Sequence, residues 1–168
     1  MTTLILTVAG SDRPGLVAAV ADIVDAHGGN WESSQLAELA GVFAGVVQVS
    51  VPAEQEADLQ EALRALDGTL TVSVHTGADA PAPADQPITL QVLGNDQPGI
   101  VREVSAVLRA HELSIHDMTT ETRDAAMAGG RLFEASVAAT VPASADLAAL
   151  RADLERLTSE LQVDITLD

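Results

Sequence analysis

The chain has 168 residues, of which 47% are hydrophobic and 20% charged, so it can form one ordinary domain or two small ones around a real core. Acidic residues number 25 against 8 basic ones, and this net charge of −17 argues against direct binding of DNA or RNA, which depends on cations that neutralise phosphates. No apolar run reaches the roughly 18 residues of a membrane span, and the absence of cysteine excludes disulfides and thiolate chemistry. We therefore expect a cytoplasmic protein.

In chain order, the first pattern is a run of β-branched and aliphatic residues, Leu4–Val8, which predicts a strand ended by Gly10. Apolar residues at the spacing of one helix face then run from Leu16 to Val24. Pro14 suits the first turn of that helix, and Gly28 suits its end. The later patterns predict strands at 31–39 and 42–51 joined by a hairpin turn at 40–41, a helix with leucines at 59, 63 and 66, and a last strand at 70–74.

The second half of the chain repeats the first. Residues 6–27 align with residues 90–111 at an offset of 84, with ten identities in 22 positions. The second copy carries about six extra residues, at 125–130. An Ala/Pro/Asp-rich stretch at 77–86 separates the copies and is typical of a semi-extended linker. The expected organisation is therefore a first domain at 1–76, a linker at 77–86 and a second domain at 87–168.

Each copy has the order βαββαβ, which is the ferredoxin-like arrangement. The predicted fold class is α+β, with two ferredoxin-like units, each an antiparallel four-stranded sheet with two helices on one face. The other face of each sheet needs a cover, for which the second copy or a second chain is the natural candidate.

Both copies carry the pattern G-x-D-x-P-G where the first strand meets the first helix, at 10–15 and 94–99. Unpaired N–H groups and a partial positive charge at a helix start suit a carboxylate. Asp12 and Asp96 can cap the helix or accept from the ammonium group of a free amino acid. Asn30, after the Gly28-Gly29 turn, offers a donor and an acceptor. The candidate ligand-binding residues are Asp12, Arg13, Pro14, Gly15, Leu16 and Asn30 in the first copy, and Asn95, Asp96, Gln97, Pro98, Gly99, Ile100 and Ser114 in the second.

Each of these residues also has a purely structural interpretation. The aspartates suit helix caps, the prolines and glycines suit loop geometry, and Asn30 suits a turn. His27 and His111 fall at equivalent helix ends, where a histidine can pair with the last carbonyl groups. No spacing of histidines and carboxylates suggests a metal site, and no catalytic triad, P-loop or nucleophile elbow is present. We therefore expect no metal, no cofactor and no enzymatic activity.

A duplicated βαββαβ unit that opens with Gly10-Ser11-Asp12-Arg13-Pro14-Gly15 resembles the ACT domain. The resemblance covers nearly the whole chain. A chain that consists of two such units is similar to the glycine cleavage system transcriptional repressor family. Two stretches of the second unit, Asn95–Val101 and Met127–Glu134, also resemble that family. The resemblance implies binding of small regulatory ligands, often amino acids, at interfaces between units, and regulation through another regulator instead of direct contact with DNA.

These observations predict a non-enzymatic regulatory protein that senses a small ligand, with an amino acid such as glycine as the candidate. It would modulate transcription through a partner regulator, and we expect a homodimer. One alternative is a ligand-free interaction or oligomerisation module that acts as a regulatory subunit. Another is the detached regulatory part of an enzyme.

Overall fold

The computed structural model describes residues 1–77, 86–125 and 129–168, and the chain divides into two units, Met1–Ala80 and Pro81–Asp168. The linker expected at 77–86 lies almost entirely outside the described residues, and Gln86 is the first residue of a strand in the second unit. Residues 126–128 of the expected insertion also lie outside the described residues.

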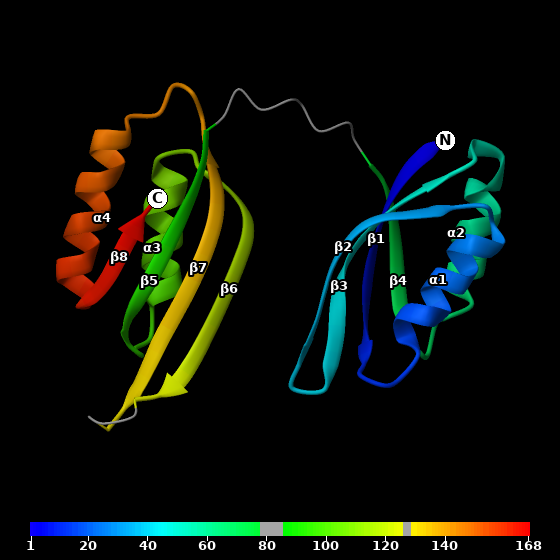
Figure 1. Ribbon diagram of the computed structural model, residues 1–168, viewed down its shortest axis with the longest axis horizontal. Coiled ribbons are helices and arrows are strands. Elements are labelled where there is room, and N and C mark those ends of the chain that lie inside the picture. The colour runs from blue at the N-terminus through cyan, green and yellow to red at the C-terminus, as the bar shows by residue number, and fades with distance from the viewer. Residues whose placement is uncertain (78–85, 126–128) are drawn as a thin grey trace. The chain divides into compact units, whose positions relative to one another are not determined.

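The first unit has the predicted βαββαβ order. Its elements are β1 (Thr2–Ser11), α1 (Leu16–Ala26), β2 (Asn30–Leu39), β3 (Val42–Val51), the short 3₁₀ helix η1 (Ala53–Gln55), α2 (Glu56–Arg64) and β4 (Thr71–Thr76). The strands form one antiparallel sheet in the order β2-β3-β1-β4. Figure 1 shows that α1 and α2 lie on the same side of this sheet, as expected.

Alternation along the strands builds the core of the first unit. Leu4, Leu6 and Val8 of β1 are almost completely buried, whereas the residues between them lie on the other face. The stripe on α1 expected from the sequence packs against them through Leu16, Val20 and Val24, together with leucines of α2. A register slip of one residue would move the buried set to the open face, so this core fixes the register of the sheet.

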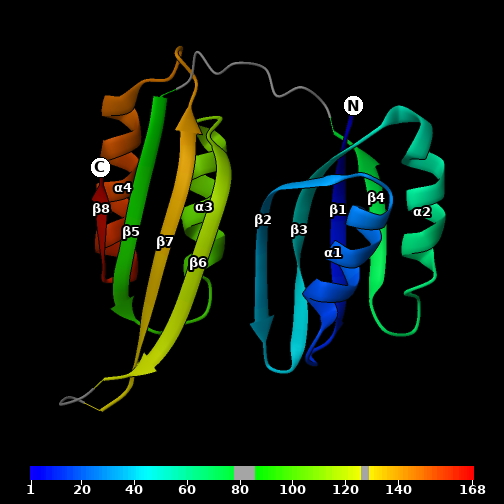
Figure 2. The ribbon, with the colours of Figure 1, turned by 45° about the vertical axis from the view of Figure 1, so that its right-hand side comes forward.

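The second unit repeats this topology. Its elements are β5 (Gln86–Asn95), α3 (Ile100–Ala110), β6 (Ser114–Asp124), β7 (Arg131–Val141), α4 (Leu147–Leu161) and β8 (Val163–Leu167). The antiparallel sheet has the order β6-β7-β5-β8, and Figure 2 shows α3 and α4 on one side of it. Its separate core contains Leu90 and Val92 of β5, the α3 stripe and three leucines of α4, namely Leu150, Leu154 and Leu157. The expected fold class is therefore confirmed in both units.

The first strand of each unit runs further than the sequence suggested. Gly10 does not end β1 but pairs with Phe43 inside the sheet, and β1 continues to Ser11. A Cβ atom at Gly10 would lie 2.8 Å from the backbone oxygen of Thr69, and one at Gly94 would lie 2.5 Å from a methyl group of Val163. These two glycines therefore allow Thr69, just before β4, and Val163, at the start of β8, to approach the first strand of their unit closely.

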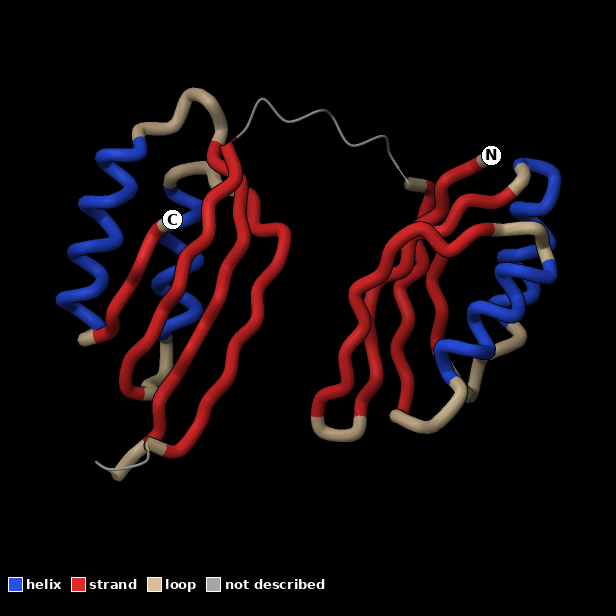
Figure 3. Tube along the Cα trace, viewed as in Figure 1, coloured by secondary structure: helices blue, strands red, loops and turns tan. Residues whose placement is uncertain are grey.

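The hairpin turn predicted at residues 40–41 is confirmed, and Figure 3 shows it as the loop that joins β2 and β3. Ala40 and Gly41 both have positive φ angles, 51° and 81°, as a tight two-residue hairpin turn requires. In the second unit the corresponding connection is longer, and the N–H of Ala125 donates to the carbonyl oxygen of Gly130 at 3.0 Å.

Candidate functional site

The loop between β1 and α1 is held in place by backbone bonds. The N–H of Asp12 donates to the carbonyl oxygen of Gly41 at 2.9 Å, which ties the loop to the β2–β3 turn. In the second unit the N–H of Asp96 donates to the carbonyl oxygen of Arg131 at 2.8 Å. In each unit, the loop after the first strand is therefore hydrogen-bonded to the connection between the second and third strands.

The predicted capping role of the aspartates is wrong. The cap positions of α1 and α3 are Gly15 and Gly99, and no side chain caps either helix. Asp12 lies three residues before its cap position, and a glycine there has no side chain that could accept a hydrogen bond. The first N–H groups of both helices are therefore left without a side-chain acceptor.

The cap glycines are needed for their backbone conformation. Gly15 has a φ of 93° and Gly99 a φ of 100°, which residues with a side chain rarely adopt. A Cβ at Gly15 would meet no atom within 4 Å, so crowding is not the reason for a glycine there. Because α1 begins only at Leu16, Pro14 lies in the loop before the helix and not in its first turn, which corrects the prediction.

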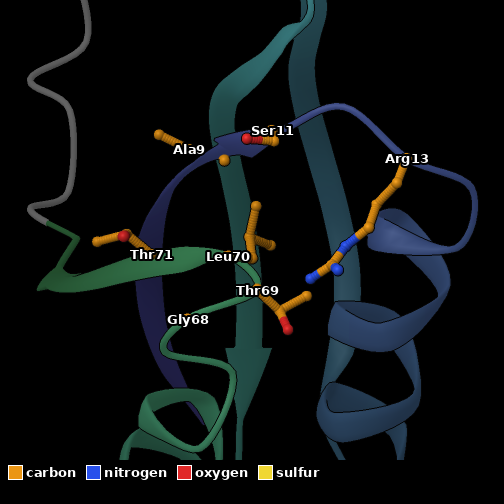
Figure 4. A pocket seen from close by; sticks show the side chains of 8 residues that line it. Ala9, Ser11, Arg13, Gly68, Thr69, Leu70 and Thr71 are labelled. Carbon is orange, nitrogen blue, oxygen red and sulfur yellow. The ribbon is translucent and has the colours of Figure 1, made fainter.

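A cleft of about 310 Å³ opens between this loop and the segment that leads into β4. Its lining is almost free of charge, with Arg13 as the one charged residue. Figure 4 shows the Arg13 side chain reaching from the β1–α1 loop toward Thr69. The lining consists of Ala9, Gly10, Ser11, Arg13, Gly68, Thr69, Leu70 and Thr71.

Arg13 is available to an anion. It is exposed, and within the described part of the chain it forms no ion pair. The first unit carries only one other basic residue, Arg64, among eleven acidic ones. A planar guanidinium can bind a carboxylate through two parallel hydrogen bonds, so the cleft has the chemistry of a site for a small carboxylate.

At the matching position in the second unit, the side chain is hydrogen-bonded to the backbone of its own unit. Gln97, the counterpart of Arg13, donates from its Nε2 to the backbone oxygen of Leu161 at 2.5 Å. Strand pairing makes Leu161 the counterpart of Gly68 in the cleft, and Asp164 the counterpart of Thr71. The second unit therefore has a neutral amide engaged with its own backbone, and an acidic residue at a position where the first unit has a hydroxyl group.

A sequence model described as the ACT domain matches residues 2–77 and 86–168, which correspond to the two units. The chain belongs to the ACT domain family.

Among relatives of this ACT domain chain is the "Glycine cleavage system transcriptional repressor" of Escherichia coli (strain K12). It is 29% identical over 162 residues, which cover 94% of this chain and 85% of the relative. A crystal structure of an unknown protein from Galdieria sulphuraria has a TM-score of 0.90 at 32% identity, covering 99% of this chain and 97% of that one. The structure of a putative glycine cleavage system transcriptional repressor has a TM-score of 0.67 at 18% identity and covers 99% and 96%, which shows the shared fold. The chain is thus an ACT domain regulatory protein related to the repressor.

The structure does not bring all the predicted site residues of an ACT unit together. Asn30 pairs with Ser50, which in turn pairs with Thr3, whereas the loop follows Ser11 at the other end of β1. Thr3 and Ser11 are eight residues apart along β1, which corresponds to about 26 Å of strand. Asn30 is also engaged, because its Nδ2 donates to Glu32 at 2.9 Å. Ser114 lies at the equivalent place in the second unit, opposite Thr140 and far from Asn95 along the strand.

Glu32 accepts two hydrogen bonds at this far end, from Ser50 at 2.7 Å and from Asn30. The Ser50 hydroxyl and then the Asn30 amide lower the pKa of Glu32 below its ordinary value, because both bonds favour the charged carboxylate. Asn30 therefore has a structural partner within its own unit.

The two histidines at equivalent helix ends have different partners. The Nδ1 of His27 lies 2.7 Å from the carbonyl oxygen of Ile23, which confirms the expected pairing with a last-turn carbonyl. For His111 the prediction is wrong: its Nε2 lies 2.8 Å from Oδ2 of Asp153 on α4. The acidic residue on the neighbouring helix is a stronger partner than a backbone carbonyl, and no local pattern indicated it.

Of the eight residues that line the cleft, only Arg13 was among the predicted site residues. Ser11, Thr69 and Thr71 line it, yet the β1–α1 pattern pointed only to residues 12–16. The repeat did contain an indication, since in a βαββαβ unit the connection into the last strand reaches the same end of the sheet as the connection out of the first. Among the residues the structure describes, no group of histidines and carboxylates is placed to hold a metal ion, and no helix is long and apolar enough to cross a bilayer.

Proposed function

We propose that this ACT domain protein is a non-enzymatic sensor whose first unit binds a small free amino acid, with glycine as the leading candidate. The observation that carries the proposal is Arg13, which forms no ion pair with the residues that the structure describes, in an otherwise uncharged cleft beside the start of α1. Glycine is favoured because the Escherichia coli relative is named as a repressor of the glycine cleavage system.

The proposed ligand is recognised at both ends. Its carboxylate pairs with the Arg13 guanidinium and with backbone N–H groups at the start of α1, around Arg13 to Leu16. The side chain of Leu16 is buried in the core, so this residue contributes only its backbone. The carboxylate of Asp12 is exposed and does not cap the helix, which leaves it able to accept from the ligand ammonium group.

We propose that the second unit binds such a ligand weakly or not at all. Gln97 is already bonded to the backbone of Leu161, so a ligand would have to displace that bond. The exposed Asp164 would repel the ligand carboxylate. The loop at Asp96, Pro98, Gly99 and Ile100 keeps the same backbone shape, yet Gln97 stands in the place of Arg13. The guanidinium of Arg102, which lies near Gly99, is paired with Glu103.

The output of the sensor is proposed to be a protein contact with a transcription regulator. A chain of net charge −17 is repelled by DNA, and three of its eight arginines, Arg102, Arg123 and Arg156, are paired with carboxylates of the same unit. Ligand binding would then act by shifting the affinity for the partner, as linkage requires. Tight, salt-sensitive binding of a promoter fragment by the pure protein would contradict this part of the proposal.

Titration calorimetry of the whole chain against the twenty amino acids tests the proposal, with glycine first. Heat with one or a few of them is expected, at one site per chain. Arg13→Gln should then weaken binding about tenfold or more, because a hydrogen-bonded charged partner is lost.

The matched control is Arg109→Gln, which removes the same charge from an exposed position in the last turn of α3 of the second unit and should leave affinity unchanged. Absence of heat with every amino acid would make the sensor proposal wrong and would favour the alternative of a ligand-free interaction module. Equal loss of affinity in both variants would show a general charge effect and would contradict the Arg13 site.

A further inference from the structure

The sheet face that α1 and α2 leave uncovered in the first unit carries almost no charge. Strand alternation and register place eighteen residues on it, and none is Asp, Glu or Arg, in a chain where one residue in five is charged. Glu32 lies beside Ser50 at one end of this face. The eighteen residues are Thr3, Ile5, Thr7, Ala9, Ser11, Asn30, Ser33, Gln35, Ala37, Leu39, Val42, Ala44, Val46, Gln48, Ser50, Thr71, Ser73 and His75.

The apolar members gather at the hairpin end of this face, and we call this set the hairpin patch: Ala9, Ala37, Leu39, Val42, Ala44 and Val46. The set is contiguous, because Ala44 pairs with both Ala9 and Ala37, and Val42 pairs with Leu39. Leu39 is 77% exposed, Val42 53% and Val46 46%. Exposed aliphatic side chains that adjoin one another on a pleated surface are typical of an interaction site.

The second unit carries charged residues on the matching sheet face. In register, Arg123 corresponds to Leu39, Glu121 to Ala37 and Glu134 to Ala44. Arg123 and Glu134 form an ion pair there, and both remain substantially exposed. The same fold therefore tolerates charges at these positions, so the apolar residues of the hairpin patch are not required by the fold of a unit.

We propose that the hairpin patch and the uncharged face around it dock against the same face of a second copy of this chain. The interface is isologous, so that each Leu39 and Val42 packs against the sheet of the other copy. This inference names the surface for self-association, which shares Ala9 and Thr71 with the lining of the Arg13 cleft. It does not require that the cleft binds a ligand.

Charge favours a second copy as the occupant. Two chains of net charge −17 repel each other wherever acidic surfaces meet, so self-association requires a surface on which charges are absent. A partner of opposite charge would be recognised by an acidic surface, which the rest of the molecule offers in abundance. An uncharged face also suits an isologous contact, because the two-fold symmetry then brings no like charges together.

The area of the uncharged sheet face is also sufficient for a dimer interface. Four strands about 4.8 Å apart and up to about 33 Å long cover roughly 600 Å² in projection. A standard interface buries about 800 Å² of accessible surface per partner, and side chains raise the accessible area of a pleated face above its projection. Two sheets stacked at about 10 Å can therefore form an interface of ordinary size.

Sedimentation equilibrium of the whole chain tests the proposal. The wild type is expected to be a dimer. Leu39→Arg combined with Ala44→Glu introduces the pair that the second unit carries as Arg123 and Glu134, so this variant should fold. It should raise the dissociation constant about 30-fold or more, because it places charges at the centre of the contact.

The matched control is Ala148→Arg combined with Ala152→Glu, which adds the same two charges at exposed positions on α4. It should remain a dimer, and Trp31 fluorescence and circular dichroism should show that both variants are folded. A wild-type monomer, or a dimer that survives Leu39→Arg with Ala44→Glu, would overturn the proposal. In the second case the contact would run through another surface, such as the edge of β2.

Discussion

The two units share one fold and differ at matched positions, so each serves as a control for the other. At the start of the first helix the first unit has Arg13 facing an open cleft, whereas the second has Gln97 bonded to Leu161. On the uncovered sheet face the first unit has Leu39 and Ala44, whereas the second has the ion pair of Arg123 and Glu134. The same backbone therefore carries an open cleft and an apolar sheet face in one copy, and an internally bonded amide and a charged sheet face in the other.

This comparison separates what the fold needs from what function needs. Gly15 and Gly99 recur because both loops require a positive φ, and Gly10 and Gly94 recur because both first strands are closely approached. Residues that recur in this way are explained by structure. Residues that differ between the units at exposed positions of the same backbone are the ones that distinguish their roles.

The largest expected effect tests whether the two cores are independent. Leu59→Ala removes a fully buried side chain from the first core and should lower the free energy of unfolding by about 2–5 kcal/mol. Trp31, the one tryptophan, packs against this core, so its fluorescence reports the first unit. Leu150→Ala in the second core should leave the Trp31 transition in place. An equal shift of that transition by both variants would show that the units unfold together.

The next largest effect is expected when the second unit is given the residue types of the first unit's cleft. Gln97→Arg with Asp164→Thr supplies a cation and removes the acid, so calorimetry with the ligand of the first unit should show a second binding event. The new interactions are hydrogen bonds to charged groups, which contribute about 1.5–3 kcal/mol each. A stoichiometry that stays at one would show that further residues of the first cleft are needed.

A smaller and equal effect is expected at the two cap glycines. Gly15→Ala and Gly99→Ala each place a side chain on a residue with φ near 100°, which costs about 1–2 kcal/mol. Both should lower the thermal stability of their own unit by a similar amount, as measured by circular dichroism. Unequal losses would show that one of the loops relaxes to a negative φ.

The smallest expected effect concerns Glu32 and its counterpart His116. Each is the bulge residue of its strand and contacts a hydroxyl of the neighbouring strand, Ser50 at 2.7 Å and Thr140 at 2.9 Å respectively. Because the pKa of Glu32 is lowered in the folded state, its bonds stabilise the unit above the unfolded pKa. That contribution is lost as pH falls through the lower, folded value.

Ser50→Ala should raise the pKa of Glu32 toward its ordinary value, since the largest cause of the shift is removed. A carboxyl titration by nuclear magnetic resonance measures this directly. Thr140→Ala, the matched variant, should leave Glu32 unaffected. A Glu32 pKa that does not move in Ser50→Ala would assign the shift to Asn30 instead.

Local patterns were sufficient to predict the duplication, the βαββαβ order and the two separate cores. These follow from local periodicity: the stripe of Leu16, Val20 and Val24 and the alternation of Leu4, Leu6 and Val8 were both apparent from spacing. The β1–α1 loop was also found, because its glycine and proline pattern is local. The predicted caps failed for a related reason, since sequence gives the residue types of a loop but not which of them occupies the cap position.

The side-chain contacts across each unit, in contrast, became known only from the folded structure. The cleft joins Arg13 to Thr69 and Thr71, more than fifty residues away, and the end of the sheet at which Asn30 lies separates it from the loop it was expected to join. The same holds for Gln97 with Leu161 and for His111 with Asp153. Such contacts depend on strand register and helix placement, which are fixed by the packed core as a whole and have no counterpart in local sequence patterns.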